Sequence, residues 1–226
     1  MIKIRHFNDA SLPVKIVRID LQTPIELHNH DFHELVMVFN GEGIHFTKNN
    51  KYKISAGDVF LIKPGTSHGY KNTNGLELVN LLYLPEKLNL MLYDLADVPG
   101  YYAFFKLEPA MRRQHGFKSR LKLNSSKIIY LKQLIKYIEE ELSLNKSGVL
   151  FTVTSYLMQI MVYISRSFTE SEQPMQMDII KLSNVLSYIE INYQHNITLA
   201  GLTRPYSKRF FVSDFPRGNF FAVGNF

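Results

Sequence analysis

The sequence contains no cysteine and no tryptophan among its 226 residues. Without cysteine there can be no disulfide, no thiolate nucleophile and no zinc–thiolate site, so any metal must be held by histidine and carboxylate. No apolar run approaches the roughly 20 residues that span a bilayer. Residues 1–9 also lack the apolar stretch of a signal peptide. We therefore expect a soluble, cytoplasmic protein that does not associate with membranes.

The charge of the chain constrains its partners only weakly. The formal net charge is +6 and the isoelectric point is about 9.3. This mild basic excess permits contact with nucleic acid without requiring it. Hydrophobic residues make up 46% of the chain, which is enough for one large domain or two small ones, each with its own core.

The first half of the sequence has the pattern of an antiparallel β domain. Short apolar or alternating segments recur at residues 15–21, 34–39, 44–48, 52–54, 59–62 and 76–84. Turn signals separate them: Asn40–Gly43, which predicts a hairpin, then Asn49-Asn50, Ser55–Asp58 and Pro64-Gly65. Many short strands joined by polar turns predict a sandwich or a barrel.

The second half changes to helical periodicity. After Ser125 or Ser126, either of which can cap a helix, apolar residues recur at steps of three and four: Leu131, Leu134, Ile135, Ile138 and Leu142. Residues 149–168 predict a second helix, apolar nearly all round, which must be covered on several sides. A third helix, capped by Asp178, is expected to reach Tyr193. Residues 110–120 are basic and predict an irregular connector.

The strongest chemical signal is a group of histidines and a glutamate at residues 28–34. In an extended chain His28, His30 and Glu34 point to one side, and His33 points away from it. Two imidazoles and a carboxylate on one face are good ligands for a divalent metal. The turn at Pro64-Gly65 can bring His68 towards them.

These residues resemble the two motifs of the cupin superfamily. The first, G-x5-H-x-H-x3-E-x6-G, matches at His28, His30, Glu34 and Gly41, with Gln22 in place of the leading glycine. The second, G-x5-P-x-G-x2-H-x3-N, matches at Gly57, Gly65, His68 and Asn72, with the proline one place late at Pro64. The resemblance implies a double-stranded β-helix. It also implies that His28, His30, Glu34 and His68 bind a divalent metal such as Zn, Ni, Mn or Fe.

A metal-free interpretation of the same residues stays open. The histidines can be polar groups hydrogen-bonded at the mouth of a barrel, or contacts for a ligand hydroxyl. We expect Tyr70 and Asn72 to join His28, His30, Glu34 and His68 in binding a small ligand. Glu77 and His45 are weaker candidates for the same pocket.

Residues 28–123 resemble the sensor domain of rhamnose-type AraC transcription regulators. The segments that carry this resemblance are residues 30–36, 52–60, 81–88 and 100–105. The resemblance implies a sugar effector, such as rhamnose or a plant-derived saccharide. It also implies two connector helices, one of which packs against its twin in a homodimer.

Residues 179–193, 197–202 and 207–215 resemble the first helix-turn-helix unit of the same family's DNA-binding domain. Ser207 would cap the reading helix, and Lys208 and Arg209 would meet DNA phosphates. However, the span between Leu202 and Ser207 is about two residues short for this pattern. It also contains Pro205, which breaks a helix interior.

Residues 214–226 do not resemble the family, and a second helix-turn-helix has no counterpart in the sequence. We interpret this as a reading-frame shift near residues 202–205; a divergent C-terminal segment is the alternative. DNA is therefore a doubtful partner, and we expect no operator-specific binding by this chain.

The predicted fold class is α+β, with a cupin barrel, a helical connector and a partial helix-turn-helix. We place the barrel at residues 1–110, the connector and dimerisation hairpin at 111–174, and the DNA-binding remnant at 175–226. The predicted function is ligand-sensing transcription regulation, without enzyme activity. The alternatives are a metal-dependent cupin enzyme of isomerase or dioxygenase type, and a module that acts by forming mixed dimers with an intact relative.

Overall fold

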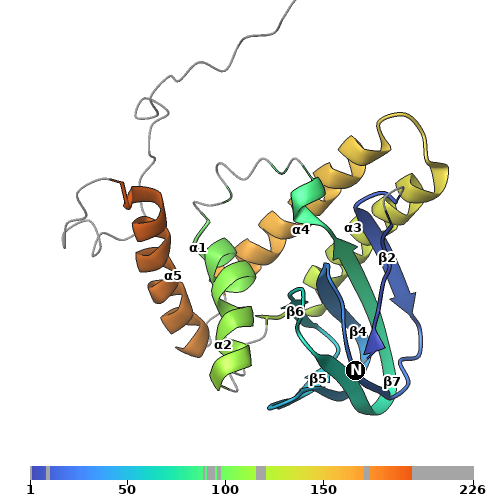
Figure 1. The fold of residues 1–226 in the computed structure, drawn as a ribbon, viewed down its shortest axis with the longest axis horizontal. Coiled ribbons are helices and arrows are strands. Elements are labelled where there is room, and N and C mark those ends of the chain that lie inside the picture. Colours follow the sequence, from blue (N-terminus) through green and yellow to red (C-terminus); the bar gives the residue numbers. More distant parts are fainter. Residues whose placement is uncertain are drawn as a thin grey trace, which may run out of the picture.

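The computed structural model describes residues 2–8, 11–88, 90, 95, 98–115, 121–170 and 174–194. Strands occupy the first part of the chain and helices the second, as the change of periodicity predicted (Figure 1). Ser207, Lys208 and Arg209, the predicted DNA contacts, lie outside the described residues. The α+β fold class is confirmed.

The described residues include eight strands in one sheet. They are β1 (Ile2–Lys3), β2 (Val14–Ile19), β3 (Ile25–Asn29), β4 (His33–Thr47), β5 (Lys51–Ser55), β6 (Asp58–Ile62), β7 (His68–Tyr83) and β8 (Leu121–Lys122). The order is β1-β3-β7-β4-β6-β8, with β2 on β7 and β5 on β4. Apart from the parallel pair β1–β3, these pairings are antiparallel.

The two long strands, β4 and β7, join the two halves of the barrel. They pair with each other along most of their length. The first half of β4 also pairs with β6 and its second half with β5. In the same way, the first half of β7 pairs with β3 and its second half with β2. Each long strand thus belongs to both halves of the domain, which is the double-stranded β-helix that the motifs implied.

The hairpin predicted at Asn40–Gly43 is wrong, because β4 runs through these residues without reversing. The register between β4 and β7 shifts repeatedly here, as in a series of β-bulges. Gly41 has φ +68°, and a side chain at this position would clash with the backbone of Gly75. The glycine therefore allows β4 to bend and to approach β7 closely at this point. The other three predicted turns are confirmed.

The helices of the described residues follow the predicted order with different starting points. They are η1 (Pro85–Lys87), α1 (Pro99–Tyr101), the π-helical η2 (Tyr102–Leu107), α2 (Glu108–His115), α3 (Ser125–Leu144), α4 (Val149–Thr169) and α5 (Pro174–Asn192). The cap of α3 is Asn124, whose side chain accepts a hydrogen bond from the Lys127 amide at 3.0 Å. The helix α5 begins before the predicted cap at Asp178.

The expectation of an irregular connector at residues 110–120 is wrong for its first half. Residues 110–115 complete α2, which continues directly from η2. The start of this helical stretch packs closely on α4, because a side chain at Gly100 would clash with the backbone of Ser165. The strands before it end at Tyr83, and β8 then returns the chain to β6. The domain limits at residues 110 and 174 stay predictions.

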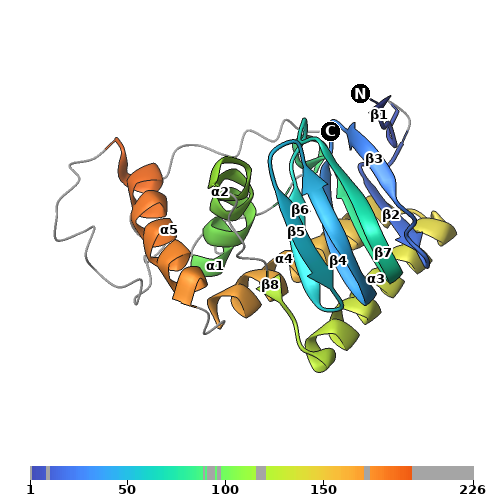
Figure 2. The same ribbon diagram turned by 90° about the horizontal axis from the view of Figure 1, so that it is seen from below.

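The main core lies between the sheet and the helices. Leu35 and Met37 of β4 and Leu81 of β7 face it, together with Leu134 and Ile138 of α3. Alternate residues of the same strands, such as Val36, Val38 and Leu78, fill the barrel interior instead. Figure 2 shows α3 and α4 lying across one side of the sheet. Helix packing therefore leaves the inside of the barrel available for a site.

By its length and composition alone, helix α4 could cross a membrane. This differs from the expectation that no apolar run of the sequence is long enough to do so. Its buried side chains pack into the main core, among them Leu157, Ile160, Ile164 and Phe168. This packing against several neighbours accounts for the apolar composition, as the sequence pattern predicted.

Helix α5, predicted to open the DNA-binding domain, packs against the connector. Ile179 is 2% exposed and belongs to the main core. Both ribbon views place α5 beside α1 and α2 (Figures 1 and 2), and it contacts η2 and α4. The helix is therefore anchored to the main core.

Candidate functional site

A cavity of about 100 Å³ lies inside the barrel. Its polar lining comes from His6, Gln22, His28, His30, Glu34, Tyr70 and Asn80. Its apolar wall includes Val17, Ile19, Phe32 and Leu82. A small cavity with a few converging polar groups and an apolar wall has the character of a small-molecule site.

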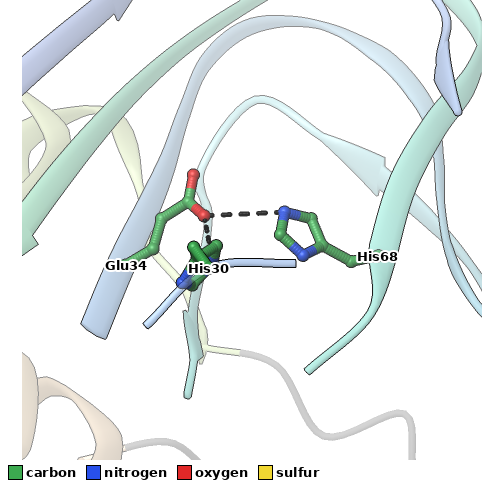
Figure 3. A group of neighbouring side chains, drawn as sticks. All are labelled: His30, Glu34 and His68. Atoms are coloured by element: carbon green, nitrogen blue, oxygen red, sulfur yellow. Dashed lines mark ion pairs between the residues drawn. The ribbon is translucent and has the colours of Figure 1, made fainter. Parts of the chain in front are cut away.

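The structure brings three of the predicted metal ligands into one group. Nε2 of His30 lies 2.9 Å from Oε2 of Glu34, and Nε2 of His68 lies 3.5 Å from the same oxygen (Figure 3). The candidate ligand atoms of the three residues all lie within 4.8 Å of one another. His30 lies between β3 and β4, whereas Glu34 belongs to β4 and His68 begins β7. The fold thus joins segments more than thirty residues apart.

His28, the fourth predicted ligand, lies beside this group. It is paired with His68 across β3 and β7, and the two ring centroids are 4.2 Å apart. His28 and His30 are 7% and 2% exposed, and His68 is fully buried. Four polar side chains therefore share one interior corner of the barrel.

Backbone carbonyls fix the tautomer of all three imidazoles. Nδ1 of His28 lies 2.9 Å from the Glu26 carbonyl oxygen. Nδ1 of His30 is 2.8 Å from that of Phe32, and Nδ1 of His68 is 3.2 Å from that of Thr66. A carbonyl can only accept, so each Nδ1 carries a proton, and in a neutral imidazole this leaves Nε2 as the nitrogen that can bind a metal. This arrangement orients histidines for metal coordination.

The Nε2 atoms of His30 and His68 are buried and have no hydrogen-bond partner among the described residues. His30 is close to the Glu34 carboxylate, but the geometry is that of an ion pair without an aligned hydrogen bond. Where both Nε2 atoms are unprotonated, their lone pairs repel the carboxylate unless a cation lies between them. Neutral imidazoles and a carboxylate are also a donor set that suits Zn²⁺ and similar cations. The residues present therefore fit a divalent metal.

The protonation states agree with this arrangement. Burial lowers the pKa of His68 to about 4, against the partial opposition of the Glu34 charge, so its imidazole is neutral at pH 7. Burial raises the pKa of the Glu34 carboxyl, but the contact with His30 and the nearby His68 lower it by more. A neutral imidazole and an ionised carboxylate are the forms that bind metal.

The remaining predicted residues take different positions. Tyr70 is 3% exposed and lines the cavity. Asn72 is exposed, has φ +51° and does not line the cavity. His45 is buried with its ring centroid 5.7 Å from that of His68, while Glu77 is half-buried outside the lining. His33 points away from the cluster, as the alternation predicted, and stacks on Tyr83 with centroids 5.2 Å apart.

Three polar lining residues were missed by sequence reasoning: His6, Gln22 and Asn80. Gln22 stands at the first glycine position of the cupin motif, which was a signal that the position had changed its role. Asn80 interrupts the apolar run of residues 76–84, a second signal. His6 reaches the cavity because the N-terminal segment folds back over it. The ring centroid of His6 lies 5.6 Å from that of Phe32. No sequence pattern predicted this contact.

Comparisons with known proteins point to one family. Residues 16–138 match the family described as AraC-like ligand binding domain. The HTH-type transcriptional activator RhaR of Mannheimia succiniciproducens is 29% identical over 221 residues, covering 97% of this chain and 70% of that protein. The RhaR of Salmonella arizonae is 36% identical over 101 residues, covering 45% of this chain and 36% of that protein. The family match at residues 16–138 includes all four predicted metal ligands.

Among solved structures, the chain is similar to a cupin 2 conserved barrel domain protein from Rhodopseudomonas palustris. The identity is 22%, the TM-score is 0.28, and the match covers 34% of this chain and 57% of the other.

Proposed function

This chain belongs to the AraC family through its ligand-binding domain, and from that premise we propose that it is a sugar-responsive transcription regulator. The effector binds inside the barrel. The observation that carries the proposal is the interior cavity, whose polar groups, apart from His6, belong to the matched residues 16–138. The relatives named as transcriptional activators support regulation as the role of that binding, and with it a cytoplasmic location.

The chemistry of the cavity suits a small polyhydroxylated effector. Its polar corner offers acceptors and donors to hydroxyl groups, and its apolar wall offers a surface to C–H groups. Its volume of about 100 Å³ encloses only part of a small ligand, and the opening of the cavity to solvent leaves space for the rest. A monosaccharide combines these properties.

We propose further that His28, His30, Glu34 and His68 hold a divalent cation in this cavity. The fixed tautomers and the buried Nε2 atoms without partners support this assignment. Such a cation would supply a Lewis-acid position for effector oxygens. The residues themselves would offer imidazole nitrogens and one carboxylate oxygen to it.

Thermal unfolding of the full chain tests both proposals. A ligand of the folded state raises the melting temperature by mass action. We expect a rise with at least one of L-rhamnose, L-fucose, D-mannose and D-xylose, and a further rise with Zn²⁺ or Mn²⁺. Glu34→Gln is expected to lose the metal response, whereas His33→Gln, in the neighbouring position on the opposite face, is expected to keep it. No response to any sugar would overturn the effector proposal.

A metal-dependent cupin enzyme of isomerase or dioxygenase type is the second candidate. The metal ligand set favours it, because catalytic sites use the same residue types. The connector helices α3 and α4, which an isolated cupin enzyme does not need, favour the regulator. Turnover of a sugar by the purified protein that disappears on chelation would support the enzyme instead.

We propose that α3 and α4 form the surface of a homodimer. Ile129 and Tyr130 of α3 and Phe151 of α4 are 67%, 44% and 77% exposed, which is unusual for large apolar side chains on two adjacent helices. Sedimentation equilibrium is expected to show a dimer that Ile129→Glu dissociates. Leu21→Glu, at an equally exposed residue before β3, is expected to leave it intact.

We also propose that this chain alone does not bind an operator specifically. The short span between Leu202 and Ser207, with Pro205 inside it, supports this. A gel-shift assay at physiological salt is expected to show only weak, salt-sensitive binding. Sequence-specific nanomolar binding would contradict the proposal. A chain of this kind could act instead by forming mixed dimers with an intact relative.

A further inference from the structure

Asn80 is the polar exception in the most deeply buried part of β7. All six residues from Leu78 to Tyr83 are buried, and the other five are apolar or aromatic. Alternation divides them between two environments. Val79, Leu81 and Tyr83 face the main core under the helices. Asn80 and Leu82 face the barrel interior and line the cavity.

The carbonyl oxygen of the Asn80 side chain is unpaired in the described part of the protein. The residue is 7% exposed, and its Oδ1 is buried without a hydrogen-bond partner among the described residues. Its cross-strand neighbours are Val17 on β2 and Val36 on β4, which have no polar side-chain atom. An unpaired buried amide destabilises the folded protein, so its presence in a cavity wall points to a partner outside the chain.

The strand register places Asn80 next to the polar corner. Asn80 is paired with Val36, and Leu82 with Glu34, on the neighbouring strands β7 and β4. Asn80 and Glu34 are therefore diagonal neighbours on the interior face, with Cα atoms about 7 to 8 Å apart in regular sheets of this kind. Both line the same cavity. A compact ligand that meets both side chains must carry two polar groups close together.

We propose that Asn80 determines the specificity of the effector site by hydrogen-bonding one of two hydroxyls on adjacent carbons. The second hydroxyl faces Glu34 and its histidine neighbours. Val17 and Leu82 contact the carbon skeleton between them. This inference rests on the proposed function, and it narrows the effector class to molecules with a vicinal diol.

The substitution Asn80→Leu tests the role of the amide, because leucine is similar in size and needs no hydrogen bond. Its melting temperature without sugar is expected to equal or exceed that of the wild type, since an unpaired polar group has been removed. Its affinity for the monosaccharide that stabilises the wild type is expected to fall at least about tenfold. Asn74→Leu, at an exposed position of the same strand, is expected to retain wild-type affinity.

A second measurement needs no substitution. L-rhamnose, D-mannose, L-fucose and D-xylose are each compared with analogues that lack one of two neighbouring hydroxyls. The wild type is expected to discriminate against one deoxy analogue by about tenfold, and Asn80→Leu is expected to lose this discrimination. If Asn80→Leu does not fold, Asn80→Ser replaces it and is expected to show the same losses.

The outcomes separate this inference from the proposed function. A sugar response in the wild type that Asn80→Leu retains would overturn the role of Asn80 and leave the effector proposal standing. A melting temperature of Asn80→Leu far below that of the wild type, together with unchanged sugar affinity, would assign Asn80 a purely structural role. No sugar response in the wild type would overturn both proposals.

Discussion

Arg18 of β2 and Glu139 of α3 form a bidentate ion pair between the barrel and the connector. Nη2 of Arg18 lies 3.0 Å from Oε2 of Glu139, and Nε lies 3.2 Å from Oε1. Val17 and Ile19, on either side of Arg18, line the cavity. One short strand therefore touches the proposed effector site with one face and the proposed dimerisation helix with the other. The pair is a direct polar link between these two regions.

Removal of this pair should weaken the attachment of α3 to the barrel. Arg18→Ala is expected to lower the free energy of unfolding by about 0.5–1 kcal/mol, since both side chains are roughly one-third exposed. The double variant Arg18→Glu/Glu139→Arg restores the pair with the charges exchanged. Its free energy of unfolding is expected to exceed that of either single variant. Urea denaturation measures all of these values. Additive losses in the double variant would show that the pair contributes nothing.

The bend of β4 predicts that replacing two glycines of positive φ by alanine will lower the stability by different amounts. Gly41→Ala meets the backbone of Gly75, so it is expected to lose more than about 3 kcal/mol of stability or to fail to fold. Gly65 has φ +76°, but a methyl group added there would meet open space. Gly65→Ala is therefore expected to lower the free energy of unfolding by about 1–2 kcal/mol. Equal losses at the two positions, measured by chemical denaturation, would contradict the close contact of β4 and β7.

Buried neutral histidines predict a loss of stability in mild acid. Burial lowers the pKa of both His68 and His33 to about 4 in the folded protein. The unfolded chain has histidine pKa values near 6.5, so it binds more protons than the folded state between pH 6.5 and 4. Stability is therefore full above pH 6.5 and falls as the pH is lowered towards 4. The expected slope is about 1.4 kcal/mol per pH unit for each group.

Denaturation at several pH values in the presence of a chelator measures this slope without a contribution from metal release. His33→Phe, which keeps an aromatic ring against Tyr83, is expected to reduce the slope by one proton. A slope that does not change in this variant would show that His33 titrates alike in both states.

Packing of α5 onto the connector predicts unequal effects of two isoleucines on the same helix. Ile179 is 2% exposed and Ile189 is 36% exposed. Ile179→Ala is expected to destabilise the protein by about 2–4 kcal/mol, and Ile189→Ala by less than about 1 kcal/mol. Comparable effects at both positions would indicate that α5 does not dock through this face.

Much of the fold was accessible from the sequence because it depends on local patterns. Alternation and turn residues marked most strands, and the spacing of two motifs joined His68 to His28, His30 and Glu34. The hairpin prediction at Asn40–Gly43 was wrong because the residue types that form hairpin turns also form β-bulges. Only the partner strand, which approaches within contact of Gly41, decides between the two.

The rest depends on contacts between distant segments. Asn80 faces the cavity because of its register against β2 and β4, which a single strand does not encode. The buried face of α5 carries Gln176 and Ser183, both 0% exposed, so its apolar pattern gave no indication of how it docks. His6 lies at the cavity because the N-terminal strand β1 pairs with β3.

The central claim is that the barrel interior binds a monosaccharide, and isothermal titration calorimetry tests it most directly. A stabilising sugar is titrated into the full chain and into two variants of β2, Val17→Phe, which fills the cavity, and Ile16→Phe, whose side chain faces the main core. We predict one binding site per chain in the wild type and in Ile16→Phe, and no binding by a folded Val17→Phe. Unchanged binding by Val17→Phe, or none by the wild type, would contradict the account.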